Sequence, residues 1–274
     1  SERRFPVDMG MRPKSSLGQN FLTNPGIVTK IVSFSGVTKG DVVLEIGPGR
    51  GILTDRLLET ASRVVAVEKD DGLFAFLSEK FSRRRNLALI HGDVLEIDMR
   101  ELISPDMKVV ANLPYNIATR ILLRFAEIPD LLHSMVVMVQ KEVAERICAP
   151  VGHSGYSALT VLLLSVFECT PGFVVGPKNF FPEPKVDSRV VKLVPRENHL
   201  PQGERDRFRQ VVMCSFGQRR KMLRNSLLNL PGVTRDTLPA ISLASGIGLE
   251  QRPQNLSWEE YRRLSRAYSQ IIVS

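Results

Sequence analysis

The tetrapeptide Asn112-Leu113-Pro114-Tyr115 combines a side-chain amide, a proline and an aromatic ring. The Asn112 side-chain oxygen and a backbone carbonyl near Pro114 can both accept hydrogen bonds from an exocyclic amino group. Proline fixes φ and stiffens the loop, and the Tyr115 ring can stack on the flat face of a base. The motif therefore indicates a site for an amino-bearing base. A proline turn with a core tyrosine is the alternative.

A glycine-rich motif, Glu-Ile-Gly-Pro-Gly-Arg-Gly, occupies residues 45–51. Glycines let the backbone turn sharply and approach a ligand closely. A dinucleotide fingerprint would need its third glycine at position 52, but that glycine is Gly51, and no Gly-Lys-Ser/Thr follows to make a P-loop. The spacing disfavours an NAD oxidoreductase and is similar to that of S-adenosylmethionine (SAM) methyltransferases. A structural strand-to-helix turn is the alternative.

Two acidic residues end the next two apolar runs. Glu68 follows Gly47 by 21 residues and can accept hydrogen bonds from both hydroxyls of a ribose. Asp93 can accept one from the exocyclic amine of an adenine. A strand-end cap and a helix N-cap are the respective alternatives. Because open α/β sheets bind ligands at the carboxyl ends of their strands, the joint occurrence of these acids and the glycine motif predicts a nucleoside cofactor site.

The elements that position these residues alternate along the chain. Short β-branched runs predict strands at 42–46, 64–68, 87–90, 108–112 and 135–139, with helices between them, including 52–59 and 70–81. This alternation predicts an α/β fold with a doubly wound, mainly parallel sheet. Runs at 167–175 and 189–194 are expected to form an edge hairpin. Only helical patterns follow Pro195, so we expect a catalytic domain over 1–200 and a small all-helical domain over 201–274.

Charge points to an anionic partner. The net charge is +8, and residues 201–274 hold 12 basic and 6 acidic side chains. Such an excess is most often associated with nucleic acid. Apolar residues at helical spacing over 206–228 predict one helix that presents cations on a single face, with a solvated helix face as the alternative. Those cations are Arg219, Arg220, Lys221 and Arg224, and a second cluster lies at 83–85.

Several classes are excluded by composition. The chain has 274 residues, 43% hydrophobic and 24% charged, as in an ordinary globular protein. Its longest apolar run, 158–166, is too short to span a bilayer, and residues 1–6 lack the apolar region of a secretory signal. The three cysteines form no C-x-x-C pair and the four histidines show no metal spacing. We therefore expect no metal, no membrane association and a reducing, cytoplasmic location.

Six segments together resemble one family, in its order and over nearly the whole chain: 14–22, 45–51, 112–115, 140–146, 180–188 and 216–221. The family is that of the ribosomal RNA small-subunit adenine dimethyltransferases. The resemblance implies a Rossmann-like, SAM-dependent enzyme. It would dimethylate the exocyclic amines of two adjacent adenosines near the 3′ end of small-subunit (16S-type) rRNA during subunit biogenesis. The implied partner is the precursor of the small ribosomal subunit, and a monomer is expected.

The resemblance also implies roles in the cofactor site. Asn20 and Leu22 would help to close it, and Gly47 would lie against the amino-acid part of SAM. Glu68 would hold the ribose and Asp93 the adenine, with Thr54 and Val94 lining the site.

At the target base, the resemblance implies that Asn112 bridges the cofactor and the target amine, with Leu113 and Pro114 in the same loop. Phe180 matches the aromatic of the F-x-P-x-P-K-V motif and would stack on the opposite face of the base from Tyr115. Phe181 falls at the variable position, and no role is implied for it.

Two other functions remain open. One is a large-subunit rRNA adenine methyltransferase of the antibiotic-resistance type, which would share the cofactor site and the aromatic pocket. The leucine in Asn-Leu-Pro-Tyr and the segment 256–261 favour the small-subunit type instead. The other is a non-catalytic RNA-binding assembly factor, which the intact set of Asn112, Glu68 and Asp93 disfavours.

Overall fold

The structure, a computed structural model, describes residues 20–273. The segment 1–6 and most of the 14–22 motif lie outside the described residues. The chain divides into two compact units, the first comprising residues up to 121 with 130–141 and 171–192, and the second 122–129, 142–170 and 193 onward. The expected helical segment 201–274 falls within the second unit, which also takes in earlier residues. The boundary at residue 200 stays a prediction.

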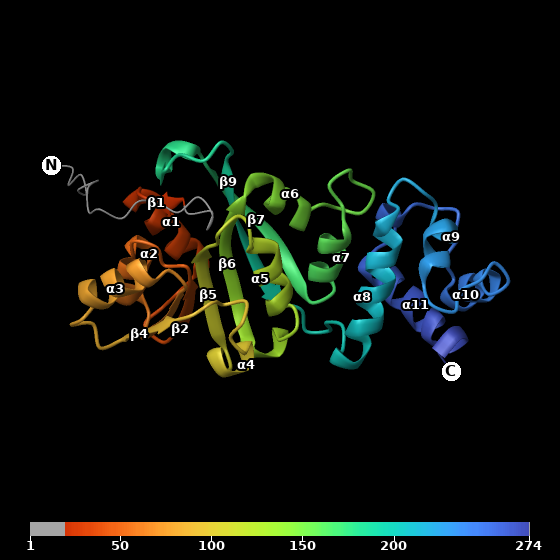
Figure 1. Cartoon of the computed structure of the whole chain (residues 1–274), viewed down its shortest axis with the longest axis horizontal. Coiled ribbons are helices and arrows are strands. Elements are labelled where there is room, and N and C mark those ends of the chain that lie inside the picture. Colours follow the sequence, from red (N-terminus) through yellow and green to blue (C-terminus); the bar gives the residue numbers. More distant parts are fainter. Residues whose placement is uncertain (1–19, 274) are drawn as a thin grey trace. The chain divides into compact units, whose positions relative to one another are not determined.

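A seven-stranded sheet has the order β4-β3-β2-β5-β6-β9-β7. The pairs β2/β3, β3/β4, β2/β5 and β5/β6 are parallel, and Figure 1 shows β5 and β6 side by side. The chain winds outward in both directions from the central pair β2 and β5, so the predicted doubly wound sheet is confirmed. The strands β9 and β7 are neighbours at one edge, as expected. The strands are β2 (Val42–Ile46), β3 (Arg63–Glu68), β4 (Leu87–His91), β5 (Met107–Asn112), β6 (Leu132–Gln140), β7 (Phe167–Val175) and β9 (Ser188–Pro195).

Apolar side chains bury the central strands of this sheet. Val43 and Leu44 of β2 and Val109 and Val110 of β5 are fully buried. Parallel strands are covered on both faces by crossover helices, so they read as continuous apolar runs rather than alternating ones. This covering explains why the strands were recognisable in the sequence.

The helices that follow these strands begin and end at recognisable residues. Asn24 accepts from the amides of Gly26 and Ile27 at the start of α1, and Gly36 ends that helix in the left-handed region. Asp70 accepts from the amide of Leu73 at the start of α3. The helices of this part are α1 (Pro25–Ser35), α2 (Ile52–Thr60), α3 (Asp71–Lys80), α4 (Met99–Leu102) and α5 (Ala118–Phe125), with a 3₁₀ turn η2 (Pro129–Leu131).

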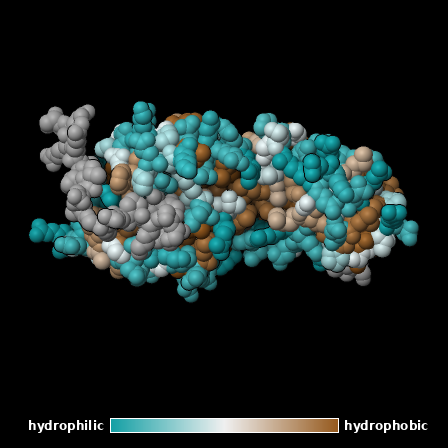
Figure 2. All heavy atoms as spheres, turned by 45° about the horizontal axis from the view of Figure 1, so that its top comes forward, coloured by the Kyte–Doolittle hydropathy of each residue, from teal (hydrophilic) through white to brown (hydrophobic). Residues whose placement is uncertain are grey.

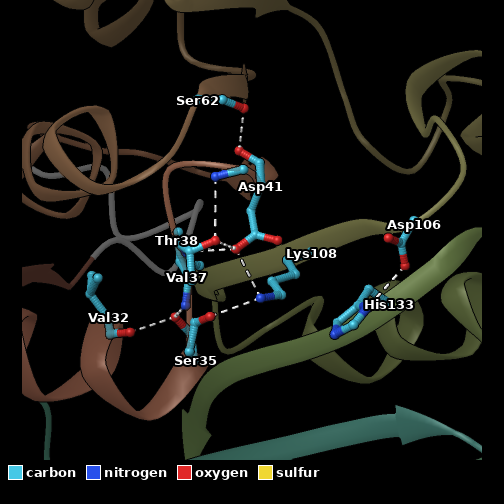
Figure 3. Close-up of polar contacts among 11 residues, drawn as sticks. Val32, Ser35, Val37, Thr38, Asp41, Ser62, Asp106, Lys108 and His133 are labelled. Atoms are coloured by element: carbon cyan, nitrogen blue, oxygen red, sulfur yellow. Dashed lines mark hydrogen bonds and ion pairs between the residues drawn. The ribbon is translucent and has the colours of Figure 1, made fainter.

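A polar network anchors the amino end of β5 (Figure 3). Lys108 is nearly buried, and its Nζ donates to the Gly36 carbonyl at 2.8 Å and to Asp41 Oδ2 at 2.9 Å. Asp41 Oδ2 also accepts from the amide of Thr38 at 2.6 Å. Partial burial alone would raise the pKa of Asp41, but these donors outweigh burial and lower it. The network ties the loop before β2 to β5.

Helices dominate the second unit, where α11 contacts both α8 and α10. Ser157 and Ser257 form capping boxes at the starts of α7 and α11. The buried Tyr156 donates its hydroxyl to the Leu256 carbonyl at 2.9 Å. These helices are α6 (Lys141–Ile147), α7 (Ala158–Leu164), α8 (Gln202–Gly217), α9 (Leu223–Ser226), α10 (Leu238–Ser245) and α11 (Trp258–Tyr268), with 3₁₀ turns η4 (Leu227–Asn229) and η5 (Pro253–Asn255) and a π-helical end, η6 (Ser269–Val273).

The expectation of one helix over 206–228 is wrong. Helix α8 ends at Gly217, and a turn closed by the Lys221 amide on the Gln218 carbonyl at 2.8 Å separates it from α9. Glycine lacks a Cβ and is a poor helix former, which favours the end of the helix at this residue. The apolar spacing nevertheless continues into α9, so the periodicity alone did not reveal the break.

Polar residues dominate the face drawn in Figure 2. Within residues 20–273, no helix combines the length and the apolar character that crossing a bilayer requires.

Candidate active site

A cavity of about 280 Å³ opens at the carboxyl ends of the central strands. This is where the strand order reverses between β2 and β5, the point at which doubly wound sheets bind ligands. Its volume is near the lower end of the range for small-molecule sites, roughly 300 Å³. The predicted site residues that line it are Asn20, Leu22, Gly47, Glu68, Asp93, Val94, Asn112, Leu113, Pro114 and Tyr115.

The glycine turn after β2 forms one wall of the cavity. Gly47, Gly49 and Gly51 all have positive φ, which L-residues with a side chain rarely adopt. A Cβ on Gly49 would lie 2.9 Å from a ring carbon of Phe21, and one on Gly51 would lie 2.8 Å from a ring carbon of Phe81. Two of the three glycines are therefore required by close packing as well as by conformation.

Glu68 ends β3 and is almost fully buried beside this turn. Its carboxylate accepts from the Asp70 amide at 2.9 Å and from the Gly49 amide at 3.3 Å. Burial raises its pKa, although the two amides act in the opposite direction. Each carboxylate oxygen has two lone pairs, so Glu68 keeps acceptor capacity after these two bonds.

Asp93 lies in the loop after β4 and is already bonded on both oxygens. One accepts from the Leu95 amide at 2.9 Å and the other from Lys69 Nζ at 2.7 Å. Partial burial would raise the pKa of Asp93, but Lys69 and the Leu95 amide outweigh it and lower the pKa. A ligand amine at this carboxylate would therefore share it with Lys69, which is largely exposed.

Asn112, the last residue of β5, has an unsatisfied side-chain oxygen. Its Nδ2 donates to the backbone carbonyl of Asn20 at 3.3 Å, which orients the amide group. Its Oδ1 is buried and has no hydrogen-bond partner among the described residues. Buried acceptors are nearly always paired, because leaving one unpaired costs roughly 1–3 kcal/mol. The unpaired oxygen lies in a residue that lines the cavity and is available to a donor entering it.

Tyr115 is held by a residue that sequence reasoning missed. Its hydroxyl and the hydroxyl of Ser188 are 2.5 Å apart. Ser188 begins β9 and is fully buried, and burial raises the pKa of Tyr115 although the bond to Ser188 opposes this. Ser188 closes the F-x-P-x-P-K-V-D-S segment, but no sequence signal pairs it with a tyrosine 73 residues earlier.

Glu45, the first residue of the glycine-rich motif, for which the sequence predicted no separate role, lines the cavity from β2 and is 1% exposed. Its Oε2 has no hydrogen-bond partner among the described residues, and burial raises its pKa to about 8. Thr54, expected to line the site, is buried on α2 and is not among the residues that line the cavity.

The two phenylalanines of the F-x-P-x-P-K-V segment have opposite surroundings. They form β8 (Phe180–Phe181), which pairs antiparallel with β1 (Phe21–Leu22) after a 3₁₀ turn η3 (Pro177–Asn179). Phe180 is 3% exposed and packs in the main hydrophobic core, outside the lining of the cavity. Its stacking role stays a prediction. Phe181 is 40% exposed.

The cations expected to bind RNA lie around the turn between α8 and α9. Arg219 donates to the Ser154 carbonyl. Arg220, Lys221 and Arg224 are exposed, and within residues 20–273 no side-chain partner is bonded to these three. Their exposed side chains can therefore reach an anionic ligand. Their role in RNA binding stays a prediction, which this exposure supports.

No group of three or more His, Cys, Asp or Glu side chains among residues 20–273 could hold a metal ion. The three cysteines are free thiols.

The parallel sheet, its switch point and the cavity together define a Rossmann-like methyltransferase fold. Two solved structures share it over most of the chain. A dimethyladenosine transferase from Plasmodium falciparum matches with a TM-score of 0.75 and 27% identity, covering 91% of this chain and 97% of that one. The 23S rRNA methyltransferase ErmE matches with a TM-score of 0.66 and 27% identity, covering 90% and 99%.

Sequence comparison then gives the family. The model of the ribosomal RNA adenine dimethylase family matches residues 10–270. Ribosomal RNA small subunit methyltransferase A from Geobacter sulfurreducens is 40% identical over 263 residues, 94% of this chain and 95% of that protein. The chain belongs to the ribosomal RNA adenine dimethylase family, as its motifs indicate.

Proposed function

We propose that the protein uses SAM to dimethylate the exocyclic amines of two adjacent adenosines near the 3′ end of small-subunit rRNA, in the biogenesis of that subunit. One observation carries this proposal. Asn112 Oδ1 is a buried acceptor without a partner, in a residue lining the cavity at the switch point of the sheet. A donor that enters the cavity would satisfy it, and for this family that donor is the amine of adenine.

The residues around the cavity fit SAM, which when bound supplies a methyl group already activated on a sulfonium. Gly47 presents bare backbone at the carboxyl end of β2, where a ligand can approach closely. Glu68 keeps lone pairs for ribose hydroxyls, and Asp93 accepts from the adenine amine in competition with Lys69. Asn20 and Leu22 cover the cavity from β1 and the residue before it.

At the target base, Asn112 Oδ1 and a backbone carbonyl near Pro114 accept the two amine hydrogens. These two hydrogen bonds would orient the nitrogen lone pair for attack on a bound methyl donor, and the Asn112 oxygen would stabilise the positive charge that develops on nitrogen. Tyr115, fixed by Ser188, supplies a ring for stacking. Holding the reacting atoms in line at roughly 3 Å can contribute on the order of 7–11 kcal/mol. These residues act by position and by exclusion of water.

RNA binding extends beyond the cavity. Arg220, Lys221 and Arg224 are exposed and would meet phosphates. The partner we propose is the small ribosomal subunit precursor, bound by a monomer of this protein, in the cytoplasm of a bacterial cell.

Methylation of large-subunit rRNA is the second candidate, because ErmE, described as a 23S rRNA methyltransferase, shares the fold. The relatives that are 40% identical are described as small subunit methyltransferases, which favours the small-subunit substrate.

Incubation with labelled SAM and purified unmethylated small or large subunits, followed by mapping of the modified nucleotide, tests the proposal. We expect dimethyladenosine at two adjacent positions near the 3′ end of the small-subunit rRNA. Label only in large-subunit rRNA would overturn the substrate, and no label in either subunit would favour a non-catalytic assembly factor.

A further inference from the structure

Among residues 20–273, Phe181 is the one exposed side chain of the Phe, Tyr and Trp type. The other exposed large apolar residues in this part of the chain are aliphatic, for example Val186, which is 46% exposed. An aromatic side chain buries roughly 150–250 Å² when it is covered, so the exposed part of the Phe181 ring is surface on which a flat ligand can stack. The family motif assigns no role to this position.

The pairing of β1 with β8 explains where this ring lies. Phe21 is the cross-strand partner of Phe181, and Leu22 is the partner of Phe180. Directly opposed residues project to the same face of a two-stranded sheet, and successive residues alternate. Phe180 and Leu22 pack in the main core, so Phe181 lies on the other face of the pair, beside Phe21. Phe21 and Arg50 both line the cavity, and the Arg50 guanidinium contacts both rings, so the Phe181 ring lies next to the lining, at the rim of the cavity.

A cation accompanies the ring. Arg50 lies in the glycine turn and lines the cavity. Its guanidinium carbon is 5.1 Å from the centre of the Phe21 ring and 5.8 Å from the centre of the Phe181 ring. Both distances are within the range of a cation–π contact, about 6 Å. The rim thus combines a flat apolar surface with a positive charge, which is how proteins bind single-stranded nucleic acid.

We propose that Phe181 and Arg50 form a stacking subsite for the nucleotide next to the adenosine being methylated. This inference rests on the proposed function, because two adjacent adenosines place a second base at the rim whenever the first occupies the cavity. The Phe181 ring stacks on that neighbouring base, and the Arg50 guanidinium contacts its phosphate. The charge next to the ring selects RNA over an apolar protein segment.

Steady-state kinetics on unmethylated small subunits tests the subsite with Phe181→Ala, Phe181→Tyr and a control, Val186→Ala. The control removes a similarly exposed apolar side chain from the same segment without removing a ring. Loss of stacking on one base should raise KM for the small subunit by about 5-fold to 100-fold in Phe181→Ala. The value of kcat should stay near wild type, because the neighbouring base is bound equally in the ground and transition states.

Four further results are expected. Phe181→Tyr restores KM to near wild type, Val186→Ala leaves KM unchanged, and SAM affinity measured by calorimetry is the same in all variants. Arg50→Met should also weaken subunit binding and reduce the slope of log K against log salt by about one. A KM within twofold of wild type in Phe181→Ala would overturn the subsite. A loss confined to kcat would overturn it too, because the ring would then act on the reacting base.

Failure of the inference differs from failure of the proposed function. If wild-type protein dimethylates small-subunit adenosines while Phe181→Ala matches it, only the subsite is wrong. If wild-type protein transfers no methyl group to small subunits, the proposed function fails and the subsite fails with it.

Discussion

Glu45→Gln replaces with a non-ionisable amide a carboxyl group that is 1% exposed and whose pKa is raised by burial to about 8. In the unfolded chain this group returns to its ordinary pKa of 4.5. Between these two values the folded protein holds a proton that the unfolded chain has released. The free energy of unfolding of the wild type therefore falls as pH rises from about 4.5 to about 8, and this group's contribution is flat above that.

The size of the effect follows from the shift. One pKa unit corresponds to about 1.4 kcal/mol, so a shift from 4.5 to about 8 corresponds to about 5 kcal/mol between the two ends of the window. Gln does not ionise and has no such dependence. We expect Glu45→Gln to match wild type near pH 5 and to be the more stable protein at pH 9, by up to that amount.

Urea unfolding at pH 5, 7 and 9, followed by circular dichroism, measures this difference. Glu101→Gln, which makes the same substitution at an exposed carboxyl on α4, is the matched control. Parallel stability profiles for Glu45→Gln and wild type across this range would refute the reasoning, because Glu45 would then be ionised at neutral pH in the folded protein.

Three other outcomes are expected. Lys108→Met should destabilise the protein by about 1–3 kcal/mol at pH 7, because it leaves Asp41 without its charged partner; a midpoint of thermal unfolding equal to that of wild type would contradict this. Tyr115→Phe and Ser188→Ala should each lower kcat/KM, and the double variant should lose no more than either alone, since both remove one hydrogen bond; additive losses would show that the two hydroxyls act separately. Arg220→Gln should weaken RNA binding by a similar factor for different sequences and reduce the salt slope by about one, measured by filter binding in a salt series; an unchanged slope would remove Arg220 from the phosphate contacts.

The strands and the placing of the site could be predicted because both depend on local sequence. Parallel strands buried on both faces leave continuous β-branched runs, and the polar residue that ends each run lies at one edge of the sheet. Asn112, Glu68 and Asp93 were found in this way, and the structure brings all three to one cavity.

Long-range contacts could not be predicted in the same way. The bond between Tyr115 and Ser188 joins residues 73 positions apart, and the raised pKa of Glu45 depends on the packing around it. Which of Phe180 and Phe181 faces the core depends on the register between β1 and β8, which a two-residue strand does not reveal in the sequence.

The break after α8 had a local signal that the periodicity concealed. Gly217 is the last residue of α8, and glycine is a poor helix former. A helix that ends at this glycine places Arg220 and Lys221 in the turn that follows.

The most direct test of the catalytic account is the Asn112→Ala variant, compared with wild type for methyl transfer to unmethylated small subunits and for binding to them. Because Asn112 Oδ1 is the unpaired acceptor in the cavity, we expect transfer to fall by about 100-fold or more. Binding of the small subunit should stay within about twofold of wild type, since the phosphate contacts are intact. Retained turnover in Asn112→Ala would contradict the role of this oxygen.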